Sequence, residues 1–286
     1  MSKKKDKLDA LIFIDTNIYL DFYRIRKSDI SLKYLEKIES LTDRLILTSQ
    51  VEMEFKKNRQ KVIIESINEV GKISAGNLSV PAILFDAKPV EMIKKAQKGI
   101  TTQQKKIKER IDKILAYPIT QDKVYQTFQR IFRTETDFNL SRKNKHRFSV
   151  RKLALKRFGL GYPPRKKEDN SIGDSINWEW IIHCAKSCDK DIIIVTRDGD
   201  YGVNYDDKSF LNDWLQIEFK ERISQKRKII LNDKLSRALK LVEVTVTQEM
   251  IDEERKIIEN QPKEIKLGID KMFNDWLEEL NKQKGV

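Results

Sequence analysis

The stretch that decides the fold is Leu11-Ile12-Phe13-Ile14-Asp15-Thr16-Asn17. Four apolar residues end abruptly in an acid, a hydroxyl and an amide. A short continuous apolar run with a polar end is typical of a strand buried on both faces and followed at once by a turn. A second such run, Ile192–Val195, leads into Thr196-Arg197-Asp198-Gly199-Asp200. Two buried strands that lie far apart in the sequence are therefore each followed by carboxylates.

Helical patterns separate these strands along the chain. Further strands are predicted at residues 45–47 and 228–231, and helices at residues 17–25, 31–40, 50–70, 171–186, 210–219 and 234–240. Strands that alternate with helices indicate an α/β sandwich around a mostly parallel sheet. Ligands of such sheets bind outside the carboxyl ends of the strands, so we expect a site where the acids lie.

A long polar segment interrupts this alternation. Residues 89–115 are strongly helical, with a narrow apolar stripe that includes Ile93, Ile100 and Ile107. Two shorter helices are predicted at residues 121–132 and 149–158. We therefore expect a core of residues 8–70 and 162–246, a basic helical insertion of residues 71–161, and a helical C-terminal tail of residues 247–286. The tail is expected to pack on the body, bind a partner protein or self-associate, and the sequence does not choose among these.

The excess positive charge of the chain lies in its middle. Between Lys56 and Lys167, 28 Lys and Arg residues face 9 Asp and Glu residues, a net charge of +19, whereas the whole chain carries +13. Such a block is typical of a nucleic-acid-binding surface, although a lysine-rich solvated helix gives the same count. The densest clusters contain Arg142, Lys143, Lys145, Arg147, Arg165, Lys166 and Lys167.

Aromatic residues are interleaved with these basic clusters. They are Tyr125, Phe128, Phe132, Phe138 and Phe148. Stacking on unpaired bases is one expected role. The alternative, which we favour, is that they form the small core of the insertion.

The composition also indicates the cellular compartment. No apolar run approaches the ~20 residues that span a bilayer. The basic N-terminus leads directly into a predicted strand, which a secretory signal peptide does not do. Cys184 and Cys188 lie four residues apart on a predicted helix with no further zinc-like ligands, so we expect reduced thiols. These features predict a cytoplasmic protein without a membrane segment.

Acids stand where strands end or helices begin, and these positions suit a metal site. They are Asp15, Glu54, Asp174 and Asp198, with Asp200 as a fifth candidate. Hard cations such as Mg²⁺ and Mn²⁺ prefer carboxylate and water oxygens. Taken singly, each acid has a structural alternative as a helix cap, an exposed helical residue or a turn residue. Their joint order along the chain favours the metal site.

The chain lacks the residues that other hydrolytic and nucleotide-dependent mechanisms need. The chain has only two histidines, His146 and His183, and neither is next to the acids in sequence. It has no Gly-x-Ser-x-Gly elbow and no phosphate-binding loop of the Walker or dinucleotide type. Phosphodiester hydrolysis by a metal held on carboxylates needs none of these groups.

Four short motifs, in this order, resemble the PIN domain of metal-dependent nucleases. They are Ile14-Asp15-Thr16-Asn17, Val51-x-x-Glu54, Gly173-Asp174-Ser175-Ile176-Asn177-Trp178 and Val195-Thr196-Arg197-Asp198-Gly199-Asp200. The resemblance covers residues 11–70 and 170–240. It implies a flavodoxin-like, PIN-like three-layer sandwich with an acidic pocket for one or two Mg²⁺ or Mn²⁺ ions.

The resemblance also implies roles for individual residues. Asp15, Glu54, Asp174 and Asp198 would bind the metal directly or through water, with Asp200 as an alternative to Asp198. Thr16 or Thr196 would orient a water, and Asn17 would brace the site. The implied activity is an endoribonuclease, with RNA favoured over DNA as partner, in the setting of a toxin or an anti-phage defence effector. A structure-specific or single-stranded DNA nuclease and a catalytically inactive nucleic-acid-binding module remain the alternatives.

Overall fold

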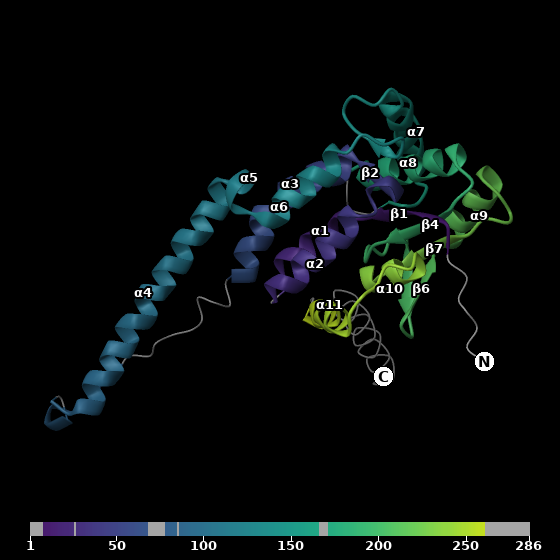
Figure 1. Cartoon of the computed structure of the whole chain (residues 1–286). Helices are drawn as coiled ribbons and strands as arrows, with labels where there is room; N and C mark the ends of the chain where they lie inside the picture. The colour runs from purple at the N-terminus through teal and green to yellow at the C-terminus, as the bar shows by residue number, and fades with distance from the viewer. Residues whose placement is uncertain (1–7, 26, 68–77, 85, 166–170, 261–286) are drawn as a thin grey trace, which may run out of the picture.

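A parallel sheet forms the centre of the molecule. The computed structural model describes residues 8–25, 27–67, 78–84, 86–165 and 171–260 (Figure 1). Within these residues, five parallel strands pair in the order β3-β2-β1-β4-β7. They are β1 (Ala10–Ile14), β2 (Leu45–Thr48), β3 (Asn139–Leu140), β4 (Asp191–Val195) and β7 (Ile229–Asn232); β5 (Gly202–Tyr205) and β6 (Lys208–Leu211) form a separate antiparallel hairpin.

Helices flank the sheet, as the predicted α/β sandwich requires. They are α1 (Thr16–Leu20), α2 (Ser28–Glu39), α3 (Ser49–Ile67), α4 (Lys88–Ala116), α5 (Pro118–Gln121), α6 (Lys123–Arg133), α7 (Arg147–Leu160), α8 (Gly173–Ser187), α9 (Asp213–Arg222), α10 (Leu235–Leu241) and α11 (Gln248–Asn260). Short 3-10 turns cover Asp21–Tyr23, Thr42–Arg44 and Ala82–Leu84. In the part of the chain that the structure describes, no helix is both long and apolar enough to cross a bilayer.

The two central strands are apolar along their whole length because both of their faces are covered. Every residue of β1 is at most 3% exposed, and Ile192–Val195 of β4 are fully buried. The two strands pair in parallel, with Ile14 opposite Val195. Continuous rather than alternating apolar runs are what a doubly covered parallel strand needs.

The order of the strands reverses between β1 and β4. From β1 the chain moves outward to β2 and β3, and then crosses back to β4 and β7 on the other side. Since crossovers between parallel strands are right-handed, α2, which leads to β2, and α9, which leads to β7, lie on opposite faces of the sheet. Helix α2 contacts α11 on one face, and α9 is bonded to α8 on the other. Figure 1 shows α7 and α8 on one side and α10 and α11 on the other. Such a reversal leaves a crevice at the carboxyl ends of the two central strands.

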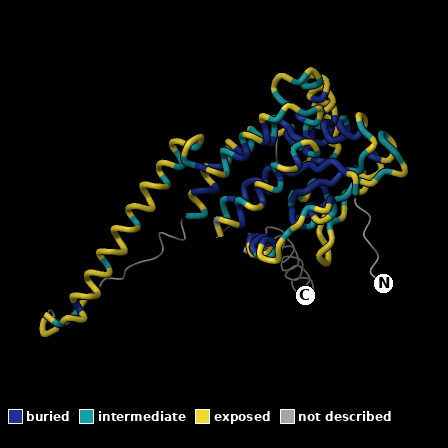
Figure 2. The backbone as a smooth tube through the Cα atoms, viewed as in Figure 1, coloured by how far each residue is buried: buried dark blue, intermediate teal, exposed yellow. Residues whose placement is uncertain are grey.

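Helix α4 projects from the body as a long exposed rod (Figures 1 and 2). Val90 is its one buried residue, and the predicted apolar stripe is largely exposed, with Ile93 at 44% and Ile107 at 44%. The C-terminal end of α4 is held by the buried Arg59 of α3. The Arg59 Nη2 atom donates to the carbonyl of Ile114 over 2.7 Å and lies 2.7 Å from the Asp122 carboxylate.

The rest of the expected insertion packs into the body. Helix α6 lies against α2, and β3 extends the central sheet by pairing with β2. The Phe128 ring stacks on Phe55 of α3 with centroids 3.7 Å apart, and on Phe132 at 4.2 Å. Phe128 and Phe132 are therefore packing residues, but the expectation that they form a separate small core of the insertion is wrong, because the core they join is that of the sandwich. By contrast, Phe148 is 75% exposed.

Two local predictions need correction. The two-residue strand β3 was not expected, because such a short run carries no periodic signal of its own. Residues 210–219 were expected to be one helix. Instead, Phe210 and Leu211 complete β6, and Asn212 caps α9 by accepting a hydrogen bond from the Trp214 amide over 3.0 Å. The hairpin partner of β6 overrides the helical pattern at that point.

The first part of the tail packs on the body. Met250 of α11 is fully buried, and the buried Glu254 accepts hydrogen bonds from the backbone amides of Leu235 and Ser236 at the start of α10. The Tyr34 hydroxyl of α2 donates to the carbonyl of Met250 over 3.0 Å. Residues 261–286 of the predicted tail lie outside the described residues.

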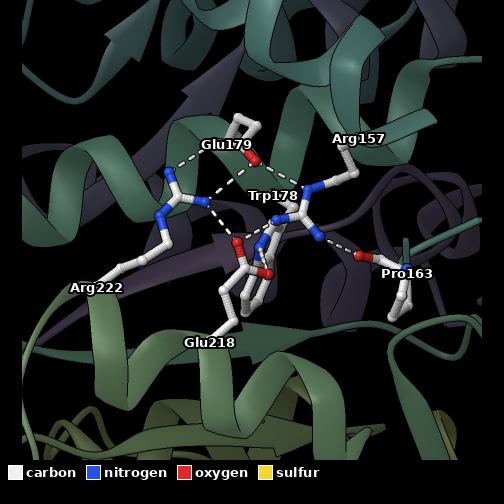
Figure 3. Close-up of polar contacts among 6 residues, drawn as sticks. All are labelled: Arg157, Pro163, Trp178, Glu179, Glu218 and Arg222. Carbon is white, nitrogen blue, oxygen red and sulfur yellow. Dashed lines mark hydrogen bonds and ion pairs between the residues drawn. The ribbon is translucent and has the colours of Figure 1, made fainter. Parts of the chain in front are cut away.

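Four buried or half-buried charges join α7, α8 and α9 (Figure 3). We call Arg157, Glu179, Glu218 and Arg222 the four-charge network. Arg157 Nε donates to Glu179 over 2.8 Å, Arg222 Nη2 donates to the other Glu179 oxygen over 2.8 Å, and both arginines also bond Glu218. Burial raises the pKa of Glu179, but Arg222 and Arg157 outweigh it, so that the pKa lies below its ordinary value. The network therefore keeps Glu179 ionised and joins α8 to α7 and α9.

Removing one charge of this network should destabilise the fold. Glu179→Gln leaves Arg157 buried at 4% exposure with less compensation, and breaking a buried pair costs roughly 3–5 kcal/mol of unfolding free energy. Urea unfolding at pH 7 measures this loss. The exposed Glu221 on α9 provides the control, since Glu221→Gln should change the unfolding free energy by less than about 0.5 kcal/mol. Equal effects of the two substitutions would contradict the role of the network.

Candidate metal centre

The parallel pairing of β1 with β4 places the first and last motifs side by side. The Asp15 amide donates to the carbonyl of Val195 over 2.9 Å, so the parallel pairing continues one residue beyond β1. The Thr196 amide continues the pairing on the other side of β4, by donating to Asn232 over 3.0 Å. The two polar turns therefore begin at the same level of the sheet.

Asp15 is both a helix cap and a member of this polar cluster. One carboxylate oxygen accepts from the Thr16 amide over 2.7 Å and caps α1. The other accepts from the Asn17 side chain over 2.7 Å and from the Thr196 hydroxyl over 2.6 Å. Asn17 also donates to Thr196 over 3.2 Å. The predicted bracing position of Asn17 thus corresponds to a hydrogen-bonded bridge between the two turns.

Burial makes Asp15 an unusual carboxylate. Desolvation raises its pKa from 3.8 to about 6, and the nearby negative charges of Glu54 and Asp198 act in the same direction. The hydrogen bonds from Thr196 and Thr16 act in the opposite direction without cancelling the effect. Negative charges gathered in a desolvated crevice favour a bound cation.

Glu54 is tied to the first motif through Thr16. The Thr16 hydroxyl donates to one Glu54 oxygen over 2.8 Å, and the Gln50 side chain donates to the other over 2.6 Å. Helix α3 is oriented by Thr48, which accepts from the Val51 amide over 3.1 Å. Thr48 in turn donates to Asn177 of α8 over 2.7 Å, so α3 and α8 approach each other at the site.

A glycine stands where α8 comes close to the side-chain ends of Glu54 and Gln50. A Cβ atom on Gly173 would lie 2.6 Å from a Glu54 oxygen and 2.7 Å from the Gln50 amide nitrogen. Both distances are shorter than real Cβ contacts, so any larger residue would displace these side chains. Asp174, the next residue, lies in the first turn of α8.

Three further carboxylates converge on one point. Oxygens of Asp174, Asp198 and Asp200 lie within 4.8 Å of one another, a spacing that suits a metal ion. The loop after β4 is shaped by the Asp198 amide, which donates to Thr196 over 2.9 Å, and by the Asp200 amide, which donates to Asp198 over 3.1 Å. The donors are all carboxylate oxygens, which Mg²⁺ and Mn²⁺ prefer.

Tyr201 is a site residue that the sequence analysis missed. Its ring is fully buried, and within the described residues its hydroxyl has no hydrogen-bond partner. Burial raises its pKa well above the ordinary value, and Asp174, Asp15, Asp198 and Glu54 all contribute to the rise. The hydroxyl therefore lies within electrostatic range of the four predicted acids. Its position directly after the Asp198-Gly199-Asp200 motif was the only available signal.

The basic residues predicted to bind nucleic acid are divided in space. Arg142 and Arg147 line a hollow of about 570 Å³ beside Gly173, and Arg142 and Lys143 line a second hollow of about 940 Å³. Lys145 is exposed and lines neither hollow. The Arg165 guanidinium lies 4.5 Å from the ring centroid of Phe158. The predicted contributors Lys166 and Lys167 lie outside the described residues.

The raised pKa of Asp15 predicts how stability depends on pH. Because the folded pKa of about 6 exceeds the ordinary 3.8, ionisation of Asp15 costs stability as the pH rises through this window. Asp15→Asn removes this cost. In EDTA, the stability of the variant relative to wild type should rise between pH 4 and pH 7 by at most roughly 3 kcal/mol. Urea unfolding at several pH values measures the difference in unfolding free energy between variant and wild type. The contributions of other titrating groups are common to both proteins and cancel in this difference. A difference independent of pH would contradict the burial argument.

The comparison with protein families agrees with this geometry. The family model described as PIN domain matches residues 12–201, more than half of the chain. The match begins in β1, ends at Tyr201 and includes α4. No curated protein and no solved structure is significantly similar to the chain. The expected resemblance is thereby confirmed, and the chain belongs to the PIN domain family, whose members are generally metal-dependent nucleases.

Proposed function

We propose that this protein is a Mg²⁺- or Mn²⁺-dependent endoribonuclease that hydrolyses RNA phosphodiester bonds. The observation that carries the proposal is the convergence of Asp174, Asp198 and Asp200 in a PIN domain, beside Asp15 and Glu54. We assign the cation to the first three residues, with Asp15 and Glu54 acting directly or through water. When bound, the metal supplies a Lewis acid and makes water a stronger nucleophile at neutral pH.

The side chains around the acids have separate tasks in this proposal. Thr196 and Asn17 fix the orientation of the Asp15 carboxylate, and Thr16 fixes that of Glu54. Of the two threonines, Thr16 is the hydroxyl that can also orient a water, because the Thr196 hydroxyl already donates to Asp15 and accepts from Asn17 and the Asp198 amide. The burial of Asp15 and Tyr201 keeps bulk water from screening these charges.

The biological setting belongs to the same proposal. We infer a cytoplasmic enzyme, because Cys184 and Cys188 are free thiols, which are typical of reducing compartments. A toxin or anti-phage defence role follows from the family resemblance. Growth arrest on expression of the wild type, but not of Asp198→Asn, would support that role. Equal growth of the two strains would contradict it.

Loss of one acid should abolish cleavage. The purified protein is assayed with Mg²⁺ or Mn²⁺ against tRNA, mRNA, single-stranded DNA and branched DNA. Asp198→Asn should reduce cleavage of RNA by a hundredfold or more, on the order of the several kcal/mol that a metal supplies to the transition state. Asp206→Asn is the matched control: Asp206 is exposed in the β5–β6 turn at φ 46°, a conformation that asparagine tolerates. Cleavage of DNA alone would replace the proposal by a DNA nuclease.

Direct metal binding separates an enzyme from an inactive binding module. Titration of Mn²⁺ into wild type, followed by electron paramagnetic resonance, should show saturable binding that Asp174→Asn weakens at least about tenfold. Asp206→Asn should bind as wild type does. Non-saturable binding by the wild type would indicate a PIN domain that has lost its metal site.

A further inference from the structure

A basic hollow adjoins the carboxylates without being part of them. It has a volume of about 570 Å³ and lies between the beginnings of α3 and α8, the end of β3 and the first turns of α7. The residues that matter for its chemistry are Gln50, Arg142, Arg147, Arg151, Ser171 and Gly173. Arg151 was not among the residues predicted to bind nucleic acid.

The charge of the hollow suits an anion. Three arginines line it, and none of the described lining residues carries a carboxylate. Among the described residues, no acid lies within ion-pair distance of Arg142, Arg147 or Arg151. Arg147 donates to the carbonyl of Arg142 over 3.4 Å, which holds the loop before α7 in place. Planar guanidinium groups with several donors match phosphate oxygens.

The larger hollow lacks this property. Its lining combines Lys56, Arg133, Arg142 and Lys143 with four acids, namely Asp43, Glu52, Glu135 and Asp137. Mixed charges of this kind do not favour a polyanion over water. The electrostatic argument therefore selects the smaller hollow.

The hollow and the acids share a wall. Gln50, which lines the hollow, donates to Glu54 over 2.6 Å. Gly173 also lines the hollow, and Asp174 follows it in the chain. The hollow therefore lies next to the residues that hold Glu54 and precede Asp174, on the side from which a bound strand can reach both.

We propose that this hollow binds one backbone phosphodiester of the RNA strand, adjacent to the phosphate that is cut, through Arg151 and Arg142. The inference rests on the proposed nuclease function, because it assigns the substrate of the same site. A pocket of carboxylates repels a polyanion, and the three guanidinium groups offset that repulsion where the strand enters. Recognition of a phosphate carries no base information, so the hollow positions the strand without selecting its sequence.

The salt dependence of binding tests this assignment. A labelled single-stranded RNA oligonucleotide is titrated with each protein in EDTA, so that no cleavage occurs, over roughly 50–200 mM salt. Arg151→Gln should weaken binding several-fold and reduce the slope of log affinity against log salt by about 0.7, the value for one lost phosphate contact on a single strand. Lys152→Gln is the matched control, because Lys152 is the next residue of α7, is exposed and lies outside the hollow.

A second variant and a second readout guard against an indirect effect. Arg142→Gln should repeat the loss of slope, with an unchanged circular dichroism spectrum for both variants. Slopes that are the same for Arg151→Gln, Arg142→Gln and Lys152→Gln would overturn the assignment. If the wild type cuts no RNA but the arginine variants lose slope, the proposed nuclease function fails and the hollow remains a phosphate site.

Neutral phosphates locate the contact relative to the cut. Once cleavage positions are mapped, single phosphates beside the cut are replaced by methylphosphonates. One replacement should raise KM for the wild type several-fold and have little effect on Arg151→Gln, because the charge it removes no longer has a partner. Equal sensitivity of both proteins at every position would overturn the assignment while leaving the nuclease function intact.

Discussion

The parallel pairing of β1 with β4 is the constraint on which the remaining structure depends. It joins residues that are about 180 positions apart in sequence, with Ile14 opposite Val195, so that Asp15 and Thr196 emerge together. The strand order reverses at this pair, and such a switch point is where ligands of parallel sheets bind. Helices α3 and α8 then need only approach this one point for Glu54 and Asp174 to join the cluster.

The sequence predicted those features that depend on local pattern. The apolar runs of β1 and β4 predicted their burial on both faces, and the order of acids predicted which turns meet. It did not predict β3, whose two residues become a strand only because the edge of β2 is there to pair with. Tyr201 and Arg151 were missed for a similar reason. A buried hydroxyl among acids and an arginine facing a hollow are defined by neighbours from other elements, which no window of sequence contains.

The site combines two opposite electrostatic regions within a short stretch of fold. Asp15 is buried at a cost in stability, while Arg142 and Arg151 remain exposed and without acidic partners among the described residues. The same element beginnings supply both regions, since α8 contributes Gly173 to the hollow and Asp174 to the carboxylates. Such a surface suits a polyanionic substrate, because carboxylates can hold a cation and the adjacent arginines can bind phosphate.

The four-charge network has a consequence for how this protein can change. Arg157 lies on the same helix as Arg151, and Glu179 lies on the same helix as Asp174, so the network connects the helices that carry the two halves of the site (Figure 3). Replacing any one of its charges leaves its two partners with less compensation. Single substitutions are therefore penalised where a simultaneous exchange of two would be tolerated. Single substitutions in the network that alter the packing of α7 on α8 are thus selected against. Related sequences should therefore differ at these four positions in pairs rather than one at a time.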